Sequence, residues 1–405
     1  MAISRITSAS IEDDAIAQAD IGTIQSVGES APSSPFIGQR WYRASTAITY
    51  QYTNDGTSSF WLDISSGGIG TSADRGIDFV GDIDPHKATN GTGLAVGSVY
   101  YNREKNRHFV CTDATSNANV WSGVYAGGGG VTSDYLLSGT YYRVHTFLRS
   151  GTFSVEREGG TFDILIIAGG GGGGNGADGE GEGGGGGAGG VKWYPAKTLA
   201  LGSYSVTVGA GGHAGYGNAD RGTNGTNSVF DTLTATGGGA GGTRNGGVQS
   251  GMTGGSGGGG GQRDNSTANA GAGTTNQGNN GGSGFEGAQM SGGGGGGAAA
   301  AGTSSPSTGV GGAGGAGIVE GTTALHNWTT GSGTTVVAVN GTAGSYAGGG
   351  GGGGQSTPAN GQHGGGNGAT AFNGGTNGTA NTGGGGGGQG GFGGSGVVIV
   401  RYALN

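Results

Sequence analysis

The chain is poor in the residues on which most folded proteins depend. Its 405 residues include 6 prolines and 1 cysteine, and only 32% are hydrophobic and 10% charged. The single cysteine, Cys111, excludes an intrachain disulfide and a cysteine-based metal site. No run of eighteen apolar residues predicts a membrane-spanning helix, and residues 1–5 lack the long apolar core of a signal peptide. We therefore expect a protein that is made in a cytoplasm and inserts into no membrane.

Positive charge is also scarce. The formal net charge is −8, and no cluster of lysine or arginine predicts a surface that could neutralise phosphates, so nucleic acid is not an expected partner. The six histidines, at positions 86, 108, 145, 213, 326 and 363, show no metal-ligand spacing. We expect neither a metal nor a cofactor.

Glycine is abundant instead, with 111 residues, most of them between two apolar segments, 162–168 and 397–402. Few side chains here can offset the 1–2 kcal/mol or so that ordering each backbone residue costs. A flexible linker would join two different parts, whereas this segment leaves one predicted strand and returns to what should be its partner. The pattern favours a folded domain held together mainly by backbone hydrogen bonds.

The glycine runs are contiguous, so they do not fit collagen, which needs glycine at every third position and abundant proline. Glycine can adopt the polyproline II conformation and pack backbone against backbone, and six such residues extend about 19 Å at ~3.1 Å each. We predict glycine-rich rods and loops over 169–396, because any inward Cβ would wedge neighbouring rods apart. A disordered Gly/Ser/Asn segment is the alternative.

Two further patterns bear on these rods. Between Asn265 and Val400 the only charged residues are Glu286 and Glu320, which favours packed rods over a solvated linker. Asn-Gly pairs between the runs suit tight reversals with positive φ; they begin at Asn175, Asn224, Asn245, Asn280, Asn340, Asn360, Asn367 and Asn377.

Alternating and apolar segments predict the base of this domain. Strands are expected within 140–168, 198–208, 228–235 and 397–402, and together they can build a compact β-sandwich from which the rods project. The predicted tip domain therefore spans 131–405.

The first 130 residues differ from the rest. Residues 1–30 carry isoleucines at a spacing of five, which predicts an elongated stem or anchor, with a partly disordered tail as the alternative. Residues 31–70 and 71–130 form two copies of a small aromatic β-module, related by a shift of 59 residues with one insertion. The second copy ends at a predicted hinge, Gly127 to Gly130. The aromatic residues either form each module's core or provide a sugar-binding platform.

Isolated apolar side chains in the glycine region are the candidate binding residues. Each lies among small and polar residues outside the predicted strands: Tyr216, Phe285, Met290, Trp328, Tyr346 and Phe372. They either plug the ends of the rods or form an exposed surface for a ligand. Surrounding asparagine, serine, threonine and glutamine would suit a saccharide.

Several of these segments, in order, resemble the C-terminal glycine-rich domain of bacteriophage tail fibres and adhesins. The similarity spans about 139–405 and rests on 142–147, 150–153, 164–168, 203–212, 227–230, 234–236 and 394–402. The duplicated module is similar, more weakly, to a short repeat of phage fibre shafts. The resemblance implies a mostly β, elongated, homotrimeric fibre of the virion, assembled in the host cytoplasm. Residues 1–30 would anchor it to the tail or to another fibre protein.

The same resemblance implies host attachment through the glycine-rich domain, with a surface polysaccharide or outer-membrane protein as receptor. A structural fibre or decoration protein without a receptor is the alternative. An enzyme is not expected, because no carboxylate pair such as glycoside hydrolysis requires has a convincing scaffold among Asp178, Glu180, Glu182, Asp231, Asp264, Glu286 and Glu320. An ice-binding protein fits the glycine rods but not the duplicated module.

Overall fold

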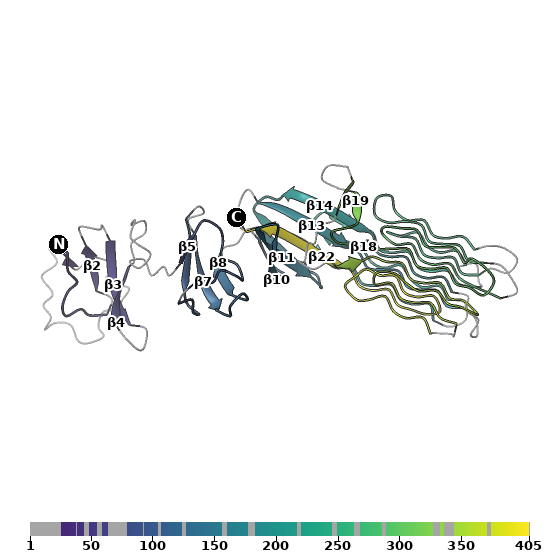
Figure 1. The fold of residues 1–405 in the computed structure, drawn as a ribbon, viewed down its shortest axis with the longest axis horizontal. Coiled ribbons are helices and arrows are strands. Elements are labelled where there is room, and N and C mark those ends of the chain that lie inside the picture. The colour runs from purple at the N-terminus through teal and green to yellow at the C-terminus, as the bar shows by residue number, and fades with distance from the viewer. Residues whose placement is uncertain are drawn as a thin grey trace, which may run out of the picture. The chain divides into compact units, whose positions relative to one another are not determined.

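The computed structural model describes residues 26–37, 39–43, 48–54, 59–63, 79–91, 93–103, 107–123, 127–155, 160–176, 183–216, 220–244, 249–262, 268–285, 289–326, 333–335, 344–370 and 374–404. Within these ranges every regular element is a β-strand, which confirms the predicted mostly β class (Figure 1). The chain divides into two compact units, Met1–Gly123 and Val124–Asn405.

Unit 1 contains two four-stranded sheets of the same topology. The first consists of β1 (Ser26–Val27), β2 (Arg40–Arg43), β3 (Ile48–Asn54) and β4 (Ser59–Asp63). The second consists of β5 (Phe79–Gly81), β6 (Val99–Asn102), β7 (Arg107–Asp113) and β8 (Val120–Gly123). In each sheet the first pair of strands is parallel and the next two are antiparallel, as expected for a duplication. The first sheet already begins inside the segment predicted as a stem; residues 1–25 lie outside the described residues.

Buried aromatic residues form the cores of the two modules of unit 1. Trp41 stacks on Tyr50 with ring centroids 4.9 Å apart, and Trp121 packs edge-on against Tyr100 at 5.7 Å. Trp41, Tyr100 and Trp121 are buried. Of the two roles considered for these rings, the structure therefore supports the core and not the sugar-binding platform.

Unit 2 contains the predicted β-sandwich, built from two five-stranded sheets. The first sheet has the order β10-β11-β22-β13-β14 and the second β17-β16-β15-β12-β9. The strands of the first sheet are β10 (Val131–Leu137), β11 (Thr140–Phe147), β13 (Thr161–Ile167), β14 (Val191–Thr198) and β22 (Val397–Ala403). Those of the second are β9 (Gly127–Gly128), β12 (Gly151–Val155), β15 (Gly202–Thr207), β16 (Ser228–Phe230) and β17 (Leu233–Ala235).

The strands before and after the glycine region are direct partners, as predicted. β13 and β22 pair antiparallel, with Leu165 opposite Ile399. Both are buried along nearly their whole length because the first sheet is covered on both faces. Phe162 faces the second sheet, where its ring lies 5.6 Å from that of Phe153. Leu165, on the other face of the same strand, belongs to a cluster with Ile318.

Three features of this region differ from the sequence-based expectation. β10 lies outside the ranges in which strands were expected. β14 was not predicted, and it places Trp193 in the core. The predicted hinge at Gly127 to Gly130 is wrong for its first two residues. Gly127 and Gly128 form β9, which pairs with β12. A Cβ on Gly127 would lie 2.4 Å from the Phe153 ring, so glycine is required here for close packing rather than for bending.

Most of the other described residues of unit 2 form extended rods that run between the sandwich and a distal end (Figure 1). In the run Gly169–Gly174, successive backbone N–H groups donate hydrogen bonds to the carbonyls of Thr226, Gly394, Gly187, Thr223, Gly391 and Gly184. Every third residue thus donates to the same neighbouring segment. A repeat of three residues without hydrogen bonds inside the run is the signature of polyproline II. We call the rods within 168–317 and 347–396, apart from the sandwich strands β14 to β17, the glycine bundle.

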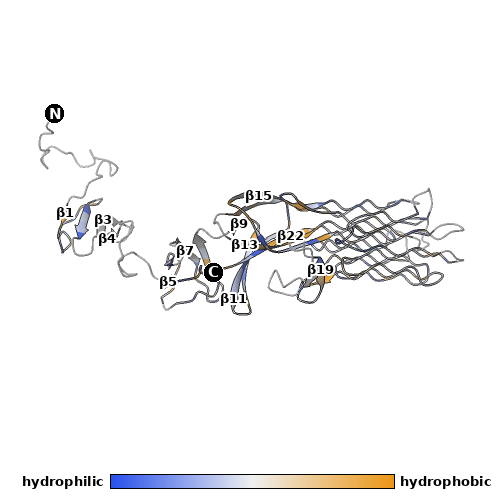
Figure 2. Ribbon diagram, turned by 90° about the horizontal axis from the view of Figure 1, so that it is seen from above, coloured by the Kyte–Doolittle hydropathy of each residue, from blue (hydrophilic) through white to orange (hydrophobic). Residues whose placement is uncertain are grey.

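Three other segments donate hydrogen bonds back to the same run. The donors are Gly212 and Gly215, Gly238 and Gly241, and Gly386 and Gln389. The run therefore donates to three rods and accepts from three others, as in hexagonal packing. A Cβ on Gly171 would lie 2.2 Å from the Gly239 carbonyl oxygen, so a rod in this position has no room for any other residue. Figure 2 accordingly shows pale rods next to hydrophobic β13 and β22.

The described asparagines of the Asn-Gly pairs do not form the predicted reversals, and Asn245 and Asn340 lie outside the described residues. Asn224, Asn280, Asn360, Asn367 and Asn377 are absent from the residues with positive φ among those described. They lie along rods, and several connect them: Asn224 Oδ1 accepts a 2.9 Å hydrogen bond from the Ala240 N–H, and Asn367 Oδ1 accepts one of 3.0 Å from Gly361. A rod at the surface lacks some of its six neighbours, and the side-chain carbonyl takes the place of a missing backbone carbonyl.

A smaller excursion leaves the bundle near the sandwich. β18 (Ile318–Val319) pairs with β21 (Ser345–Tyr346), and between them β19 (Ala324–His326) pairs with β20 (Gly333–Thr335). Ile318 is completely buried in the cluster that covers the outer face of the first sheet. The excursion thus closes the core where the sandwich and the bundle meet.

Candidate functional site

Three of the six predicted binding residues lie at the distal end of the glycine bundle. Tyr216 is the last residue of the described rod that leaves β15, and it is 78% exposed. Phe285 ends another outgoing rod, and Met290 precedes the returning rod of 291–297; both are half-buried. All three therefore lie at rod ends, and a binding role for them stays a prediction.

Tyr346 is at the opposite end. It lies in β21, immediately before the rod of 347–354, and is only 8% exposed because it packs into the hydrophobic cluster with Ile318. A role for Tyr346 in an exposed surface is therefore wrong, and of the two roles considered it has the structural one. Trp328 and Phe372 lie outside the described residues.

A residue that the sequence analysis missed is exposed on the side of the bundle, about midway along the rods. Phe392 is 47% exposed, and its ring lies edge-on to that of His213 with centroids 5.9 Å apart. His213 is one polyproline II turn, three residues, before Tyr216, so the two side chains leave the same side of their rod. We call His213, Tyr216 and Phe392 the aromatic patch. The signal that selected Tyr216, an isolated aromatic residue among glycines, applies equally to Phe392.

The backbone under the aromatic patch is fixed by hydrogen bonds between rods. Gly393 N–H donates to the Gly212 carbonyl at 2.9 Å, which ties together the rods that carry Phe392 and His213. His213 N–H donates to Thr223 Oγ1 at 2.8 Å, and Phe392 N–H donates to Asn377 Oδ1 at 3.0 Å. The rings therefore stand on a rigid base and lose little backbone freedom on binding a ligand.

A second distal surface surrounds Met290 and is polar. Gln289 N–H donates to Thr308 Oγ1 at 3.0 Å, and Ser356 Oγ donates to Gln289 Oε1 at 3.0 Å. Met290 N–H donates to Gln355 Oε1 at 3.2 Å. These bonds hold three described segments together, and they occupy much of the hydrogen-bonding capacity of the side chains involved.

Buried amides and hydroxyls close the distal ends of the central rods. Gln389 Oε1 accepts a 2.6 Å hydrogen bond from Gly176 N–H, and Thr243 Oγ1 donates to the Asn175 carbonyl. These side chains satisfy backbone groups that the rods themselves leave without partners. The described residues at the distal end therefore form an ordered surface.

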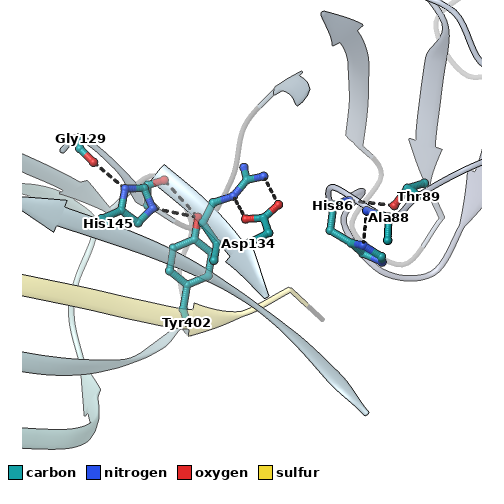
Figure 3. A network of polar contacts seen from close by, with 9 residues as sticks. His86, Ala88, Thr89, Gly129, Asp134, His145 and Tyr402 are labelled. Atoms are coloured by element: carbon teal, nitrogen blue, oxygen red, sulfur yellow. Dashed lines mark hydrogen bonds and ion pairs between the residues drawn. The ribbon is translucent and has the colours of Figure 1, made fainter. Parts of the chain in front are cut away.

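The titratable groups with unusual environments lie in the sandwich, away from the distal end. Figure 3 shows His145, whose Nδ1 is 2.6 Å from the Gly129 carbonyl and whose Nε2 is 3.4 Å from Tyr402 Oη. Burial lowers the pKa of His145 from 6.5 to about 4, against the opposing effect of the Gly129 hydrogen bond. The figure also shows Asp134, whose carboxylate accepts two hydrogen bonds from Arg143 at 2.8 and 2.9 Å. These groups stabilise the base of the bundle.

A groove of about 440 Å³ also lies in the sandwich, around Val131, Phe147 and Arg149. It is lined mainly by apolar surface at the corner between β11 and β12, and none of the predicted binding residues contributes to it.

The described residues contain no group of three or more His, Cys, Asp or Glu side chains that could hold a metal ion. Of the carboxylates considered for hydrolysis, two are described. Asp231 is exposed in a turn of the sandwich, and Glu320 is buried at its base. The others lie outside the described residues. No described helix is long and apolar enough to cross a membrane.

Comparison with known proteins assigns the larger unit. No curated protein matches the chain. The family described as "Glycine-rich domain" matches residues 146–403, from the end of β11 through the whole bundle to the end of β22. The match covers more than half of the chain and includes both the sandwich strands and the rods described above. The chain therefore belongs to the glycine-rich domain family.

Proposed function

We propose that this chain is a tail-fibre protein of a bacteriophage virion, and that the distal end of its glycine bundle attaches to the surface of a host bacterium. The observation that carries the proposal is the aromatic patch. Tyr216 is exposed at the distal end and Phe392 on the side of the same bundle, a scaffold whose other described rods are nearly free of large apolar side chains. Exposed apolar groups gathered in one place indicate an interaction site rather than a folding requirement.

The scaffold supports this function physically. A rod with six hydrogen-bonded neighbours cannot bend without breaking bonds to several rods at once, so residues at the distal end keep their relative positions. Binding proteins commonly combine a rigid framework with variable loops, because preorganised residues lose little entropy on binding. Surface changes at the distal end would leave the packing of the glycine runs intact.

The remaining parts of the proposal concern assembly. We propose a homotrimeric fibre in which residues 1–30 join the tail or another fibre protein and the two modules of unit 1 form part of the shaft. Two exposed apolar side chains on the edge strand β10, Val131 at 66% and Leu136 at 55%, are candidates for burial between chains. The receptor would be a surface polysaccharide or an outer-membrane protein, and the chain would act without catalysis.

The direct test is adsorption. Labelled full-length chain is incubated with host bacteria and, as a specificity control, with bacteria that the phage does not infect. The proposal expects binding to the host alone, and a slower adsorption of phage when the chain is in excess. A chain that neither binds host cells nor slows adsorption would overturn receptor binding.

Location in the virion needs a separate experiment. Gold-labelled antibodies against unit 2 should mark the free ends of the tail fibres in electron micrographs. If the antibodies label the virions but the chain does not bind host cells, the alternative of a structural fibre protein is favoured. Absence of the label from virions would contradict the tail-fibre assignment itself.

A further inference from the structure

We propose that the aromatic patch formed by His213, Tyr216 and Phe392 is a saccharide-binding platform on the side of the glycine bundle, which reaches the distal end at Tyr216. The inference rests on the proposed function and names the chemistry of one contact surface within it. It separates this surface from the polar turns around Met290.

The shape of the patch argues for a flat ligand face. Phe392 and His213 belong to adjacent rods and meet edge to face at 5.9 Å, and Tyr216 follows His213 by one turn, about 9 Å along the rod. Exposure recurs at every third residue of this rod, at Ala210, His213 and Tyr216, so the side chains follow one line on the surface. Such rings offer flat apolar faces without a deep pocket. The C–H face of a hexose matches a surface of this kind.

The surroundings of the rings supply hydrogen bonds for a polyol. Asn377 accepts from the Phe392 N–H through Oδ1, and its exposed side chain also carries the Nδ2 donor. Thr223 accepts from the His213 N–H through Oγ1 and also carries a hydroxyl hydrogen. An amide and a hydroxyl next to aromatic rings can bind the hydroxyl rim of a sugar while its C–H face contacts the rings.

A neutral glycan fits this chemistry better than an apolar or a charged ligand. A peptide held by apolar contacts needs a groove, and the groove around Val131, Phe147 and Arg149 is in the sandwich, away from the aromatic patch. Asp220 and Arg221, of opposite charge, follow Tyr216 at the next described positions of the chain. They leave no net charge to select an acidic or basic ligand.

Substitution of the rings tests the platform. In the full-length chain, Tyr216→Ala and Phe392→Ala should each weaken binding to purified host surface polysaccharide, measured by calorimetry, by about three- to tenfold. Both positions already carry a Cβ that points out of the bundle, so alanine leaves rod packing unchanged, and an unaltered circular dichroism melt would verify this. Phe36→Ala is the matched control, because Phe36 is 50% exposed but lies in unit 1, and it should bind as the unchanged chain does.

The outcomes separate this inference from the proposed function. If Tyr216→Ala and Phe392→Ala bind the polysaccharide as tightly as the unchanged chain, the platform is wrong. If both variants lose adsorption to cells, but periodate oxidation of the cell-surface glycans leaves adsorption of the unchanged chain intact, the patch binds a protein and the saccharide assignment fails. If the unchanged chain binds host cells and none of the purified polysaccharide, the inference fails while receptor binding stands. Failure of the unchanged chain to bind host cells overturns the proposed function instead.

Discussion

In the interior of the bundle, glycine is required because no space is left for a Cβ atom. A Cβ on Gly171 would overlap the Gly239 carbonyl at 2.2 Å, and the oxygen cannot retreat because its rod is bonded to other rods. Serine, asparagine and threonine instead occupy the outer rods, where their side chains replace missing carbonyls. The purity of the glycine runs is therefore a packing requirement of the rods and not a sign of flexibility.

Gly171→Ala tests this requirement. We expect a loss of stability of at least about 3 kcal/mol, at the upper end of overpacking effects, because the neighbouring backbones cannot move apart independently. Thermal unfolding of unit 2 in the full-length chain measures it. Gly151→Ala is the control, because its Cβ would meet Phe147 at an ordinary 3.7 Å. A Gly171→Ala variant as stable as Gly151→Ala would contradict close backbone packing.

His145 makes stability depend on pH. Burial holds its folded-state pKa at about 4, below the unfolded value of 6.5, so the unfolded chain takes up a proton first as the pH falls. Above about pH 6.5 the imidazole is neutral in both states, so His145 does not lower the free energy of unfolding. Between about pH 6.5 and 4 this free energy falls by up to about 3 kcal/mol. Gly129, Tyr402, Arg143 and Asp134 surround the ring or act on its charge.

Replacement by a side chain that does not titrate isolates this contribution. His145→Gln should show a smaller fall in unfolding free energy between pH 6.5 and pH 4 than the unchanged chain, as measured by denaturant titration at each pH. Its stability at neutral pH will be lower, so the slope with pH is the informative quantity. Equal slopes for the two proteins would show that His145 titrates normally in the folded state.

At the scale of elements, the sandwich determines where the rods begin. β13 and β22 pair in the centre of the first sheet, and the buried Arg401 donates to Asp163 at 2.7 Å between them. Asp163 also accepts a 2.8 Å hydrogen bond from Ala196 N–H in β14. One carboxylate thus connects three neighbouring strands at the edge of the core.

Asp163→Asn should therefore destabilise unit 2 by roughly 3 kcal/mol, because it removes the negative charge that the buried guanidinium of Arg401 contacts at 2.7 Å. Asp82→Asn is a matched control, since Asp82 binds Arg103 with similar distances, 2.8 and 2.9 Å, but both side chains are more than half exposed. We expect its unfolding midpoint to stay nearly unchanged. Comparable losses in the two variants would show that burial does not govern the strength of these pairs.

The strands also show which sequence patterns were sufficient to predict secondary structure and strand pairing. Long apolar runs such as 162–168 and 397–402 predicted strands and even their pairing, because burial on both faces leaves little else as an interpretation. β14 was missed because Lys192, Pro195 and Lys197 interrupt its apolar pattern. The Asn-Gly pairs misled because the local preference for turns gave way to side-chain bonds between rods, which depend on neighbours far away in sequence. The exposed position of Phe392 depended on the same packing.

At the scale of the whole molecule, the proposed fibre predicts association of chains. Sedimentation equilibrium of the full-length chain should give three times the 38.6 kDa monomer mass. Replacement of the exposed Val131 and Leu136 on β10 by lysine should shift the equilibrium toward the monomer if chains meet at this strand. A unit mass of 38.6 kDa at micromolar concentration would contradict a stable homotrimer.

The central claim is that the glycine-rich region is an ordered scaffold that holds a binding surface in place. Hydrogen–deuterium exchange of the full-length chain, resolved by peptide, tests it most directly. Because successive N–H groups of the rods donate to neighbouring rods, peptides from 169–174, 292–297 and 383–389 should exchange as slowly as those of β13 and β22. Complete exchange of the glycine peptides within seconds, while the sandwich strands stay protected, would show a flexible linker and contradict the account.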